Sequence, residues 1–278
     1  MSVTAPATPS APSPAAAPPV RAMDQFATFR AVLSRDLFVT GRELVGFLLQ
    51  VFIQPLFMLL IFGKVLGDLG YASDDFTNVL LPGVIALNAF LIGLENTALP
   101  MVMDFSFTRE IEDRLLSPMA IPLVALEKIV FGGIRGLIAG VVLIPVGMLM
   151  LDVTWPWAVV LKVIGVLAVG ALVGAALGLT FGTLVPTQHI QIMFTVVMTP
   201  LMFTGATQFP LLGLDSLRWY QVICSLNPLT YVSEATRSLV GPSGVESVPL
   251  WLDLLVLAGV FVVFTVIGIR GFMRRAMD

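Results

Sequence analysis

Long apolar segments separated by short polar ones fill most of this 278-residue chain. A helix needs about 20 apolar residues to cross the hydrocarbon core of a bilayer, which is roughly 30 Å thick. Segments of about that length or longer occur at residues 44–66, 79–103, 124–150, 158–185, 190–213 and 252–270. The charge-free runs at 44–63 and 163–185 do not alternate with a period of two residues, which favours helices over barrel strands. The pattern predicts an all-α integral membrane protein with six transmembrane helices.

An amphipathic helix is expected before the first segment, in the stretch "DQFATFRAVLSRDLF". Helical spacing brings four apolar side chains to one side of it, Phe26, Phe29, Leu33 and Leu37. The sequence offers no soluble core on which such a helix could dock. We therefore expect it to lie along the membrane surface.

A second short helix is expected between the fifth and sixth segments, in "NPLTYVSEATRSLVG". Asn227 suits a helix N-cap, Pro228 suits the first helical position, and Gly241 suits the end of the helix. Because it would fall on the outer side, we expect this helix to lie in the outer membrane interface.

The first 22 residues differ in composition from the rest. Residues 1–20 hold six alanines, six prolines and no charged side chain. Such a composition cannot build a core, and it lacks the basic start and continuous apolar centre of a signal peptide. We expect residues 1–22 to be a disordered tail and residues 23–278 to form one transmembrane domain.

The basic residues predict an orientation, because cytoplasmic loops carry an excess of lysine and arginine. One side of the six-span arrangement would hold Arg21, Arg30, Arg35, Arg42, Arg109, Arg114, Lys128, Arg270, Arg274 and Arg275. The other side would hold only Lys64, Lys162, Arg218 and Arg237. We therefore expect a multi-pass protein with both termini in the cytoplasm.

Composition excludes several other classes of function. Hydrophobic residues make up 57% of the chain and charged residues 12%, with a net charge of −3. No basic stripe is present to neutralise phosphates, so no nucleic-acid partner is expected. One cysteine, Cys224, cannot form an intrachain disulfide, and one histidine, His189, cannot build a histidine-rich metal site. We expect Cys224 to pack as a small hydrophobe and His189 to stand at a helix start.

Charge is concentrated at residues 109–114, "REIEDR", between the second and third segments. The leucines and proline that follow, in "LLSP", favour a short cytoplasmic helix that offers charges and apolar side chains to a soluble partner. An ordinary charged loop is the alternative that the pattern leaves open.

Together, "TREIEDRLLSPMAIP" and "NPLTYVSEATRSL" resemble the permease subunits of ABC-2-type transporters, in particular the bacterial drug-exporter branch. The resemblance covers about residues 24–275. It implies a homodimer or heterodimer of six-helix subunits, each gripping a separate ATPase through the second-to-third loop. It implies an ATPase-coupling element made of Arg109, Glu110, Glu112, Asp113, Arg114, Leu115, Leu116, Ser117 and Pro118. The family motif of the outer helix corresponds to Asn227, Pro228, Leu229, Thr230, Tyr231 and Arg237.

No nucleotide-binding motif is present in the chain itself. Its lysines are Lys64, Lys128 and Lys162, and none is followed by serine or threonine, as a phosphate-binding loop requires. We therefore expect no cofactor and no enzymatic activity in this chain, with ATP and Mg bound by the partner ATPase.

Two segments offer candidate substrate contacts. In the second, Asn88, Glu95 and Asn96 share one helical face, and polar groups inside a bilayer usually face a cavity or a protein interior. In the fifth, flexible and aromatic side chains suit lipophilic ligands and equally suit ordinary packing. These residues are Met193, Phe194, Met198, Met202 and Phe203. The resemblance implies that both helices line the substrate path.

A buried ion pair is also predicted. Glu95 lies nine residues from Asp104, about 13 Å along a helix, and Arg135 lies seven residues from Lys128, about 10 Å. Because these depths nearly match on consecutive antiparallel helices, we predict that Glu95 and Arg135 pair within one subunit.

The expected function is an ATP-powered exporter's membrane subunit, which moves a lipophilic drug-like molecule or lipid out across the bacterial cytoplasmic membrane. The alternative is a proton-coupled secondary transporter that uses Glu95. Against it, only the fifth segment is strongly broken, without a matching broken segment in the other half of the chain.

Overall fold

A computed structural model describes residues 22–70, 74–106, 119–241 and 247–277. Within these ranges the regular elements are all helices. In chain order they are α1 (Ala22–Arg42), α2 (Leu44–Met58), η1 (Leu59–Val65), α3 (Leu66–Asp68), α4 (Asp74–Ser106), α6 (Ile121–Leu151), α7 (Trp157–Leu184), η2 (Thr187–His189), α8 (Ile190–Thr204), η3 (Leu211–Leu217), α9 (Arg218–Ser225), α10 (Pro228–Val240) and α11 (Leu250–Met277).

Five helical rods in the described ranges are long and apolar enough to cross a membrane. They are Leu44–Asp68, Phe76–Phe105, Ile121–Leu151, Trp157–Leu184 and Leu250–Ala276. The first rod consists of α2, η1 and α3 in succession. Five of the six predicted segments are thus confirmed as long apolar helices.

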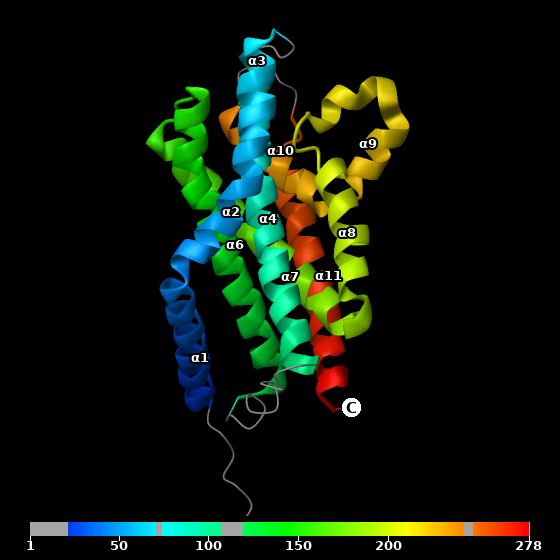
Figure 1. The fold of residues 1–278 in the computed structure, drawn as a ribbon. Helices are drawn as coiled ribbons and strands as arrows, with labels where there is room; N and C mark the ends of the chain where they lie inside the picture. The colour runs from blue at the N-terminus through cyan, green and yellow to red at the C-terminus, as the bar shows by residue number, and fades with distance from the viewer. Residues whose placement is uncertain (1–21, 71–73, 107–118, 242–246, 278) are drawn as a thin grey trace, which may run out of the picture.

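The remaining segment, 190–213, does not form one continuous helix. α8 ends at Thr204 after 15 residues, about 22 Å of helix, which is shorter than the hydrocarbon core. Ala206 has a left-handed backbone with φ of 48°, and Pro210 precedes η3. A left-handed residue cannot continue a right-handed helix, and proline lacks the N–H that a helix interior needs. The chain instead turns through η3 and α9 before α10 (Figure 1).

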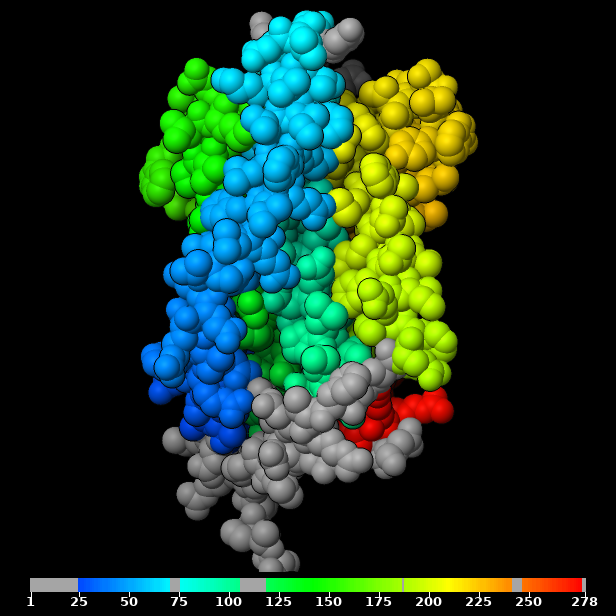
Figure 2. Space-filling view, viewed as in Figure 1, coloured from blue at the N-terminus to red at the C-terminus, as the bar shows by residue number. Residues whose placement is uncertain are grey.

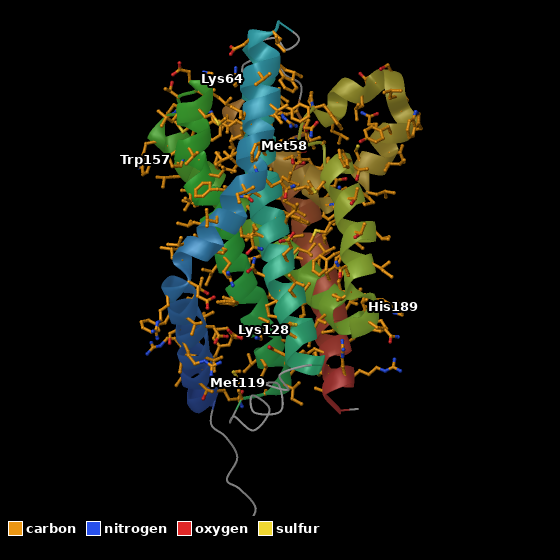
Figure 3. All side chains as sticks on the ribbon, in the orientation of Figure 1. Met58, Lys64, Met119, Lys128, Trp157 and His189 are labelled. Atoms are coloured by element: carbon orange, nitrogen blue, oxygen red, sulfur yellow. The ribbon has the colours of Figure 1, made fainter. Side chains whose placement is uncertain are left out.

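α4 lies in the middle of the bundle, packed against α6, α7 and α10, while α11 packs on α7 and α10 (Figure 1). α1 and the last turns of α11 lie at the same end of the molecule, which we call the arginine-rich end. Figure 3 places Met119, Lys128 and His189 toward this end, and Lys64 and Trp157 toward the opposite end. Lys64 and Lys128 are therefore separated as the charge pattern predicts.

The predicted amphipathic helix is present as α1, but it does not lie across the bundle. In Figure 1 it runs beside α6 in roughly the direction of the spanning helices. Phe29 packs against a buried cluster that includes Ile129 of α6 and Phe272 of α11. Part of the apolar face is therefore used for packing on the bundle, which is the physical reason for the difference from a helix lying flat.

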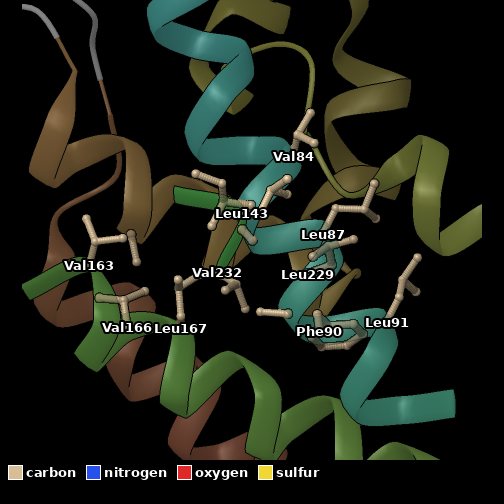
Figure 4. Packing of buried hydrophobic residues seen from close by; sticks show 14 of the residues in the cluster. Val84, Leu87, Phe90, Leu91, Leu143, Val163, Val166, Leu167, Leu229 and Val232 are labelled. Carbon is tan, nitrogen blue, oxygen red and sulfur yellow. The ribbon is translucent and has the colours of Figure 1, made fainter. Parts of the chain in front are cut away.

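The largest group of buried apolar side chains surrounds α4 (Figure 4). It includes Val84, Leu87, Phe90 and Leu91 of α4, Leu143 of α6, Val163, Val166 and Leu167 of α7, and Leu229 and Val232 of α10. Lipid tails are as apolar as these side chains, so the hydrophobic effect drives little association between helices within a bilayer. Close packing holds the helices together instead.

Small residues let the backbone of α4 approach α6 and α7 closely. A Cβ atom added to Gly174 of α7 would overlap the carbonyl oxygen of Phe90, and Gly178 meets α4 in the same way one turn further on. Gly136 of α6 would likewise overlap the carbonyl oxygen of Ala89. α4 is thus held by backbone contact on two sides, as small residues permit in membrane helices.

Gly174→Ala should force α4 and α7 apart and lower the free energy of unfolding by about 1–3 kcal/mol, the usual cost of overpacking. Gly165→Ala on the same helix is the matched control, because a Cβ there meets no atom within 4 Å. It should be neutral or slightly stabilising, since alanine favours a helix. Unfolding of the solubilised variants measures both, and equal effects would argue against the backbone contact.

Candidate functional site

Three adjoining cavities form a groove between α2, α4 and α6, and Gln50 lines all three. Their volumes are about 460, 300 and 130 Å³. Figure 2 shows the hollow between the blue α1–α2 side and the teal α4, with green α6 visible on its floor. We call this feature the α2–α4 groove.

The lining of the α2–α4 groove changes along its length. The two larger cavities are nearer the arginine-rich end and contain the charged side chains, Arg42, Glu43, Glu95 and Arg135. The smallest cavity continues toward the opposite end with mostly apolar walls, Pro55, Met58, Val84, Leu87, Leu91 and Ile92, and with the amides of Gln54 and Asn88. The groove therefore has most of its charged side chains at one end and a mixture of apolar side chains and amides at the other, with Glu95 between them.

The three polar residues predicted as substrate contacts on α4 all line the groove. The Asn88 Nδ2 donates to the carbonyl oxygen of Ala139 on α6 at 3.2 Å, which fixes its amide between the two helices. The Asn96 Nδ2 donates to the carbonyl oxygen of Ile92 in its own helix at 2.9 Å. Glu95 lines two of the cavities and is partly exposed.

The candidate residues on α8 do not line the groove. Met193 and Met198 are buried, Phe194 packs partly buried against the core, and Phe203 is 62% exposed. Met202 alone is connected to the groove, because its sulfur accepts a hydrogen bond from the Gln54 Nε2 at 3.6 Å. α8 thus stands beside the groove without forming its wall.

The predicted Glu95–Arg135 ion pair is not formed among the described residues, where no such contact lies within 4.0 Å. Both side chains line the same cavity. The Arg135 guanidinium instead lies 4.6 Å from the ring centroid of Phe47 and 5.7 Å from that of Phe131. Its attraction to the Phe47 ring of α2 and to the Glu43 carboxylate, which immediately precedes α2, is the physical reason that it turns toward α2.

A buried ion pair does join the same two helices, nearer their ends. The Lys128 Nζ lies 2.8 Å from the Asp104 Oδ2, and only 6% and 10% of the two side chains are exposed. Asp104 and Lys128 are the two residues from which we measured the helical depths above. The predicted antiparallel alignment of α4 and α6 is therefore confirmed at this point.

Lys128→Met should lower the free energy of unfolding by about 3–5 kcal/mol, because it leaves the Asp104 carboxylate buried and unpaired. Adding Asp104→Asn to it should recover much of this loss, since no charge then remains. Lys162→Met, at an exposed position of α7, should change little. Chemical denaturation in detergent would measure the double-mutant cycle of Lys128 and Asp104. Strictly additive effects of the two replacements would contradict the ion pair.

Several groove residues were not predicted from the sequence. Gln50 and Gln54 lie four residues apart in the charge-free run of the first span, and Phe47 lies one turn before them. Two amides on one helical face of an otherwise apolar segment are the feature of the sequence that could have identified Gln50 and Gln54 as groove residues. The proximity of Phe47 to Arg135 depends on tertiary packing and carries no local signal.

The motif residues of α10 tie the end of α8 to the rest of the molecule. The Asn227 Oδ1 accepts from the Leu229 N–H at 2.9 Å and caps α10 as predicted. Its Nδ2 donates to the carbonyl oxygen of Leu201 at 2.9 Å and to the Thr204 hydroxyl at 3.0 Å. The Leu201 carbonyl is one of the last four of α8, which have no partner within the helix, so Asn227 satisfies a group that the helix break leaves free.

The next motif residues contact the turn around α9. The Thr230 hydroxyl donates to the carbonyl oxygen of Cys224 at 2.7 Å, and the Tyr231 hydroxyl donates to that of Ser225 at 2.7 Å. Burial raises the pKa of the Tyr231 phenol, so the neutral donor persists well above neutral pH. Pro228 occupies the first turn of α10, and Leu229 is fully buried.

Arg237 is the largest fully buried side chain in the described ranges. Its guanidinium contacts the Glu234 carboxylate and donates to the carbonyl oxygen of Ala206 at 2.9 Å and of Val79 at 3.4 Å. The Glu234 Oε1 also accepts from the Leu211 N–H at 3.0 Å. The pair thus connects α4, the break after α8, and η3.

α10 therefore does not lie on a surface as we predicted for an interfacial helix. Its residues from Leu229 to Arg237 are buried apart from Tyr231, and the helix packs against α4, α7 and α11. The predicted start at Pro228 and the end before Gly241 are confirmed. The reason for the different placement is that its polar side chains bond to protein groups rather than to water.

Asn227→Ala should lower the free energy of unfolding by about 1–3 kcal/mol, because the cap and two further hydrogen bonds are lost. Asn227→Asp keeps the cap acceptor but cannot donate to α8, so it should also destabilise. Ser225→Ala removes only an exposed local bond to Val222 and serves as control. Thermal unfolding distinguishes these, and wild-type stability in Asn227→Asp would show that only the cap matters.

The single histidine and the single cysteine of the chain both lie at or next to helix ends. His189 immediately precedes α8, as predicted. Cys224 is buried, and burial raises the pKa of its thiol, which keeps it neutral. The described part of the chain contains no group of three or more His, Cys, Asp or Glu side chains that could hold a metal ion. The predicted coupling residues from Arg109 to Pro118 lie outside the described residues.

Two comparisons identify the family of the chain. The sequence profile described as "ABC-2 type transporter" matches residues 27–240. A curated relative named "Putative transport permease ycf38", from Cyanophora paradoxa, is 26% identical over 232 residues, which cover 76% of this chain and 74% of that protein. The matched region includes the α2–α4 groove, the segment between α4 and α6, and the motif helix α10. This chain belongs to the ABC-2 type transporter family of membrane proteins.

Proposed function

We propose that this chain is the membrane-spanning permease subunit of an ATP-powered exporter in the bacterial cytoplasmic membrane. It moves a lipophilic drug-like molecule or a lipid outward. The observation that carries the proposal is the α2–α4 groove, which has charged side chains at one end and both apolar side chains and amides at the other. A groove of this kind suits a molecule that has both a polar and an apolar part.

The energy source in this proposal is a separate ATPase subunit that binds ATP and Mg. Residues 109–118 join α4 directly to α6, and both of these helices line the groove. In the proposed orientation, with both termini in the cytoplasm, a push on this segment is passed to the groove through α4 and α6. The Lys128–Asp104 contact links the adjoining ends of α4 and α6, so these ends move together.

A second permease subunit completes the proposed transporter, as a homodimer or heterodimer. α2 and α8 support this, because they expose large apolar side chains on either side of α4, among them Val45, Phe57, Val196 and Phe203. Such side chains face lipid or another subunit.

A proton-coupled secondary transporter is the second candidate. The observation that favours it is Glu95, a carboxylate within a spanning helix that makes no ion pair within 4.0 Å among the described residues. Proton relays of transporters use carboxylates in such positions.

Transport in inside-out vesicles tests the proposal. Vesicles that contain the permease with its co-purified ATPase should accumulate a fluorescent phospholipid analogue when ATP and Mg are added, and vanadate should stop the accumulation. Alanine replacement of Arg109, Glu110 and Glu112 together should lower both ATPase docking and transport, because the charges that meet the partner are lost.

A variant of the partner ATPase that binds but does not hydrolyse ATP is the matched control, and it should abolish accumulation. Accumulation that requires a pH gradient and no nucleotide would overturn the proposal in favour of the second candidate. Docking that is unchanged by the triple replacement would overturn the coupling role of residues 109–114.

A further inference from the structure

The two spanning-helix charges of the α2–α4 groove have different surroundings. Arg135 lies over the Phe47 ring, close to the Phe131 ring and in the field of the Glu43 carboxylate. Aromatic faces and an acidic neighbour both stabilise a guanidinium. The Arg135 guanidinium is therefore held toward Phe47 and makes no ion pair with Glu95 within 4.0 Å.

Glu95 has a polar neighbour but no cation within ion-pair distance among the described residues. Its side chain lies beside the Gln50 amide, and none of the ion pairs of the described residues includes it. The groove residues around it on α4 are mostly apolar, with Leu91 and Ile92 on one side and Leu99 on the other. A carboxylate among apolar groups in a spanning helix is costly unless a cation or a proton meets it.

On the far side of Glu95 the groove continues as a smaller cavity, lined by apolar side chains and by the amides of Gln54 and Asn88. Met58, Val84 and Leu87 are among its apolar lining residues, and it shares Gln50 and Glu95 with the wider cavity next to it. A ligand that fills both cavities would therefore place one part against the carboxylate and another part against apolar side chains. Together with the third cavity, the available space is in the range of drug-sized ligands, about 300–1,000 Å³.

We propose that the α2–α4 groove binds amphiphilic organic cations, with the positive group against the Glu95 carboxylate and the apolar body along Met58, Val84 and Leu87. This inference rests on the proposed function, in which the groove is the substrate site. It goes beyond the proposed function by specifying that the substrate carries a positive charge. An anionic ligand would be repelled by the Glu95 carboxylate, which makes no ion pair within 4.0 Å among the described residues, whereas a cation would pair with it.

Binding of two matched hydrophobic ions tests the inference. Tetraphenylphosphonium and tetraphenylborate have nearly the same size and shape and opposite charge. Equilibrium binding of each to the purified permease in nanodiscs of zwitterionic lipid, corrected for empty nanodiscs, should show a preference for the cation. Glu95→Gln, which has the same shape, should weaken cation binding about tenfold, as expected when one partner of a partly buried charge pair is lost.

Two further variants make the comparison specific. Glu95→Asp keeps the charge and should retain most of the preference for the cation. Asp215→Asn removes an exposed carboxylate of η3 and should leave cation binding unchanged. Thermal unfolding of each variant shows that it is folded, so that a loss of binding is not a loss of structure.

Equal binding of the two ions, or cation binding that Glu95→Gln leaves unchanged, would overturn the inference. The proposed function fails separately. If the cation binds through Glu95 but ATP drives no transport of any lipophilic probe, the proposed cation site is supported and the proposed exporter function is contradicted. If ATP drives transport of probes without regard to their charge, the exporter function is supported and the preference for cations is contradicted.

Discussion

The close backbone approach between α4 and the helices α6 and α7 is the contact on which the rest of the structure depends. Within a bilayer, side chains gain little by leaving lipid for another apolar surface, so association must come from dense packing and hydrogen bonds. Gly136 and Gly174 supply this density, because at each position the carbonyl oxygens of α4 occupy the place of a side chain. α4 can then be almost fully enclosed and still carry polar groups.

Enclosure of α4 on most of its circumference concentrates its polar side chains in one strip. Asn88 and Asn96 are each satisfied by a carbonyl oxygen of the protein, whereas Glu95 faces the groove. The end of the molecule away from the arginine-rich end is built differently. There α8 stops early, and hydrogen bonds from Asn227 and Arg237 hold the break in place. The bundle thus combines a closely packed side, a helix break held by hydrogen bonds, and the α2–α4 groove.

Local sequence patterns predicted most of the helices and some of the polar contacts. Apolar length alone identified five spanning rods, and the prolines and glycine near 200–210 signalled that the fifth segment is broken. The cap by Asn227 followed from residue type and position. The sharing of one groove by Asn88, Glu95 and Asn96 followed from helical spacing.

Features that depend on the mutual rotation of helices could not be predicted in this way. Matching depths placed Glu95 and Arg135 at nearly the same level, but depth does not determine which way a side chain turns, and Arg135 turned to Phe47. The burial of α10 was not predicted, because a short helix with polar side chains has the same local pattern whether it is buried or on a surface. In α10 these side chains form hydrogen bonds with backbone groups of Ala206, Leu211 and Ser225.

Cysteine labelling along α4 tests most directly the claim that this helix is enclosed except at the groove. In a Cys224→Ala background, Glu95→Cys, Leu99→Cys and Met103→Cys should react with a water-soluble maleimide, because these positions are partly or largely exposed. Leu94→Cys and Met101→Cys, at positions that are fully buried, should stay unlabelled in the folded protein and react after denaturation. Labelling at similar rates on all faces of α4 would contradict the account.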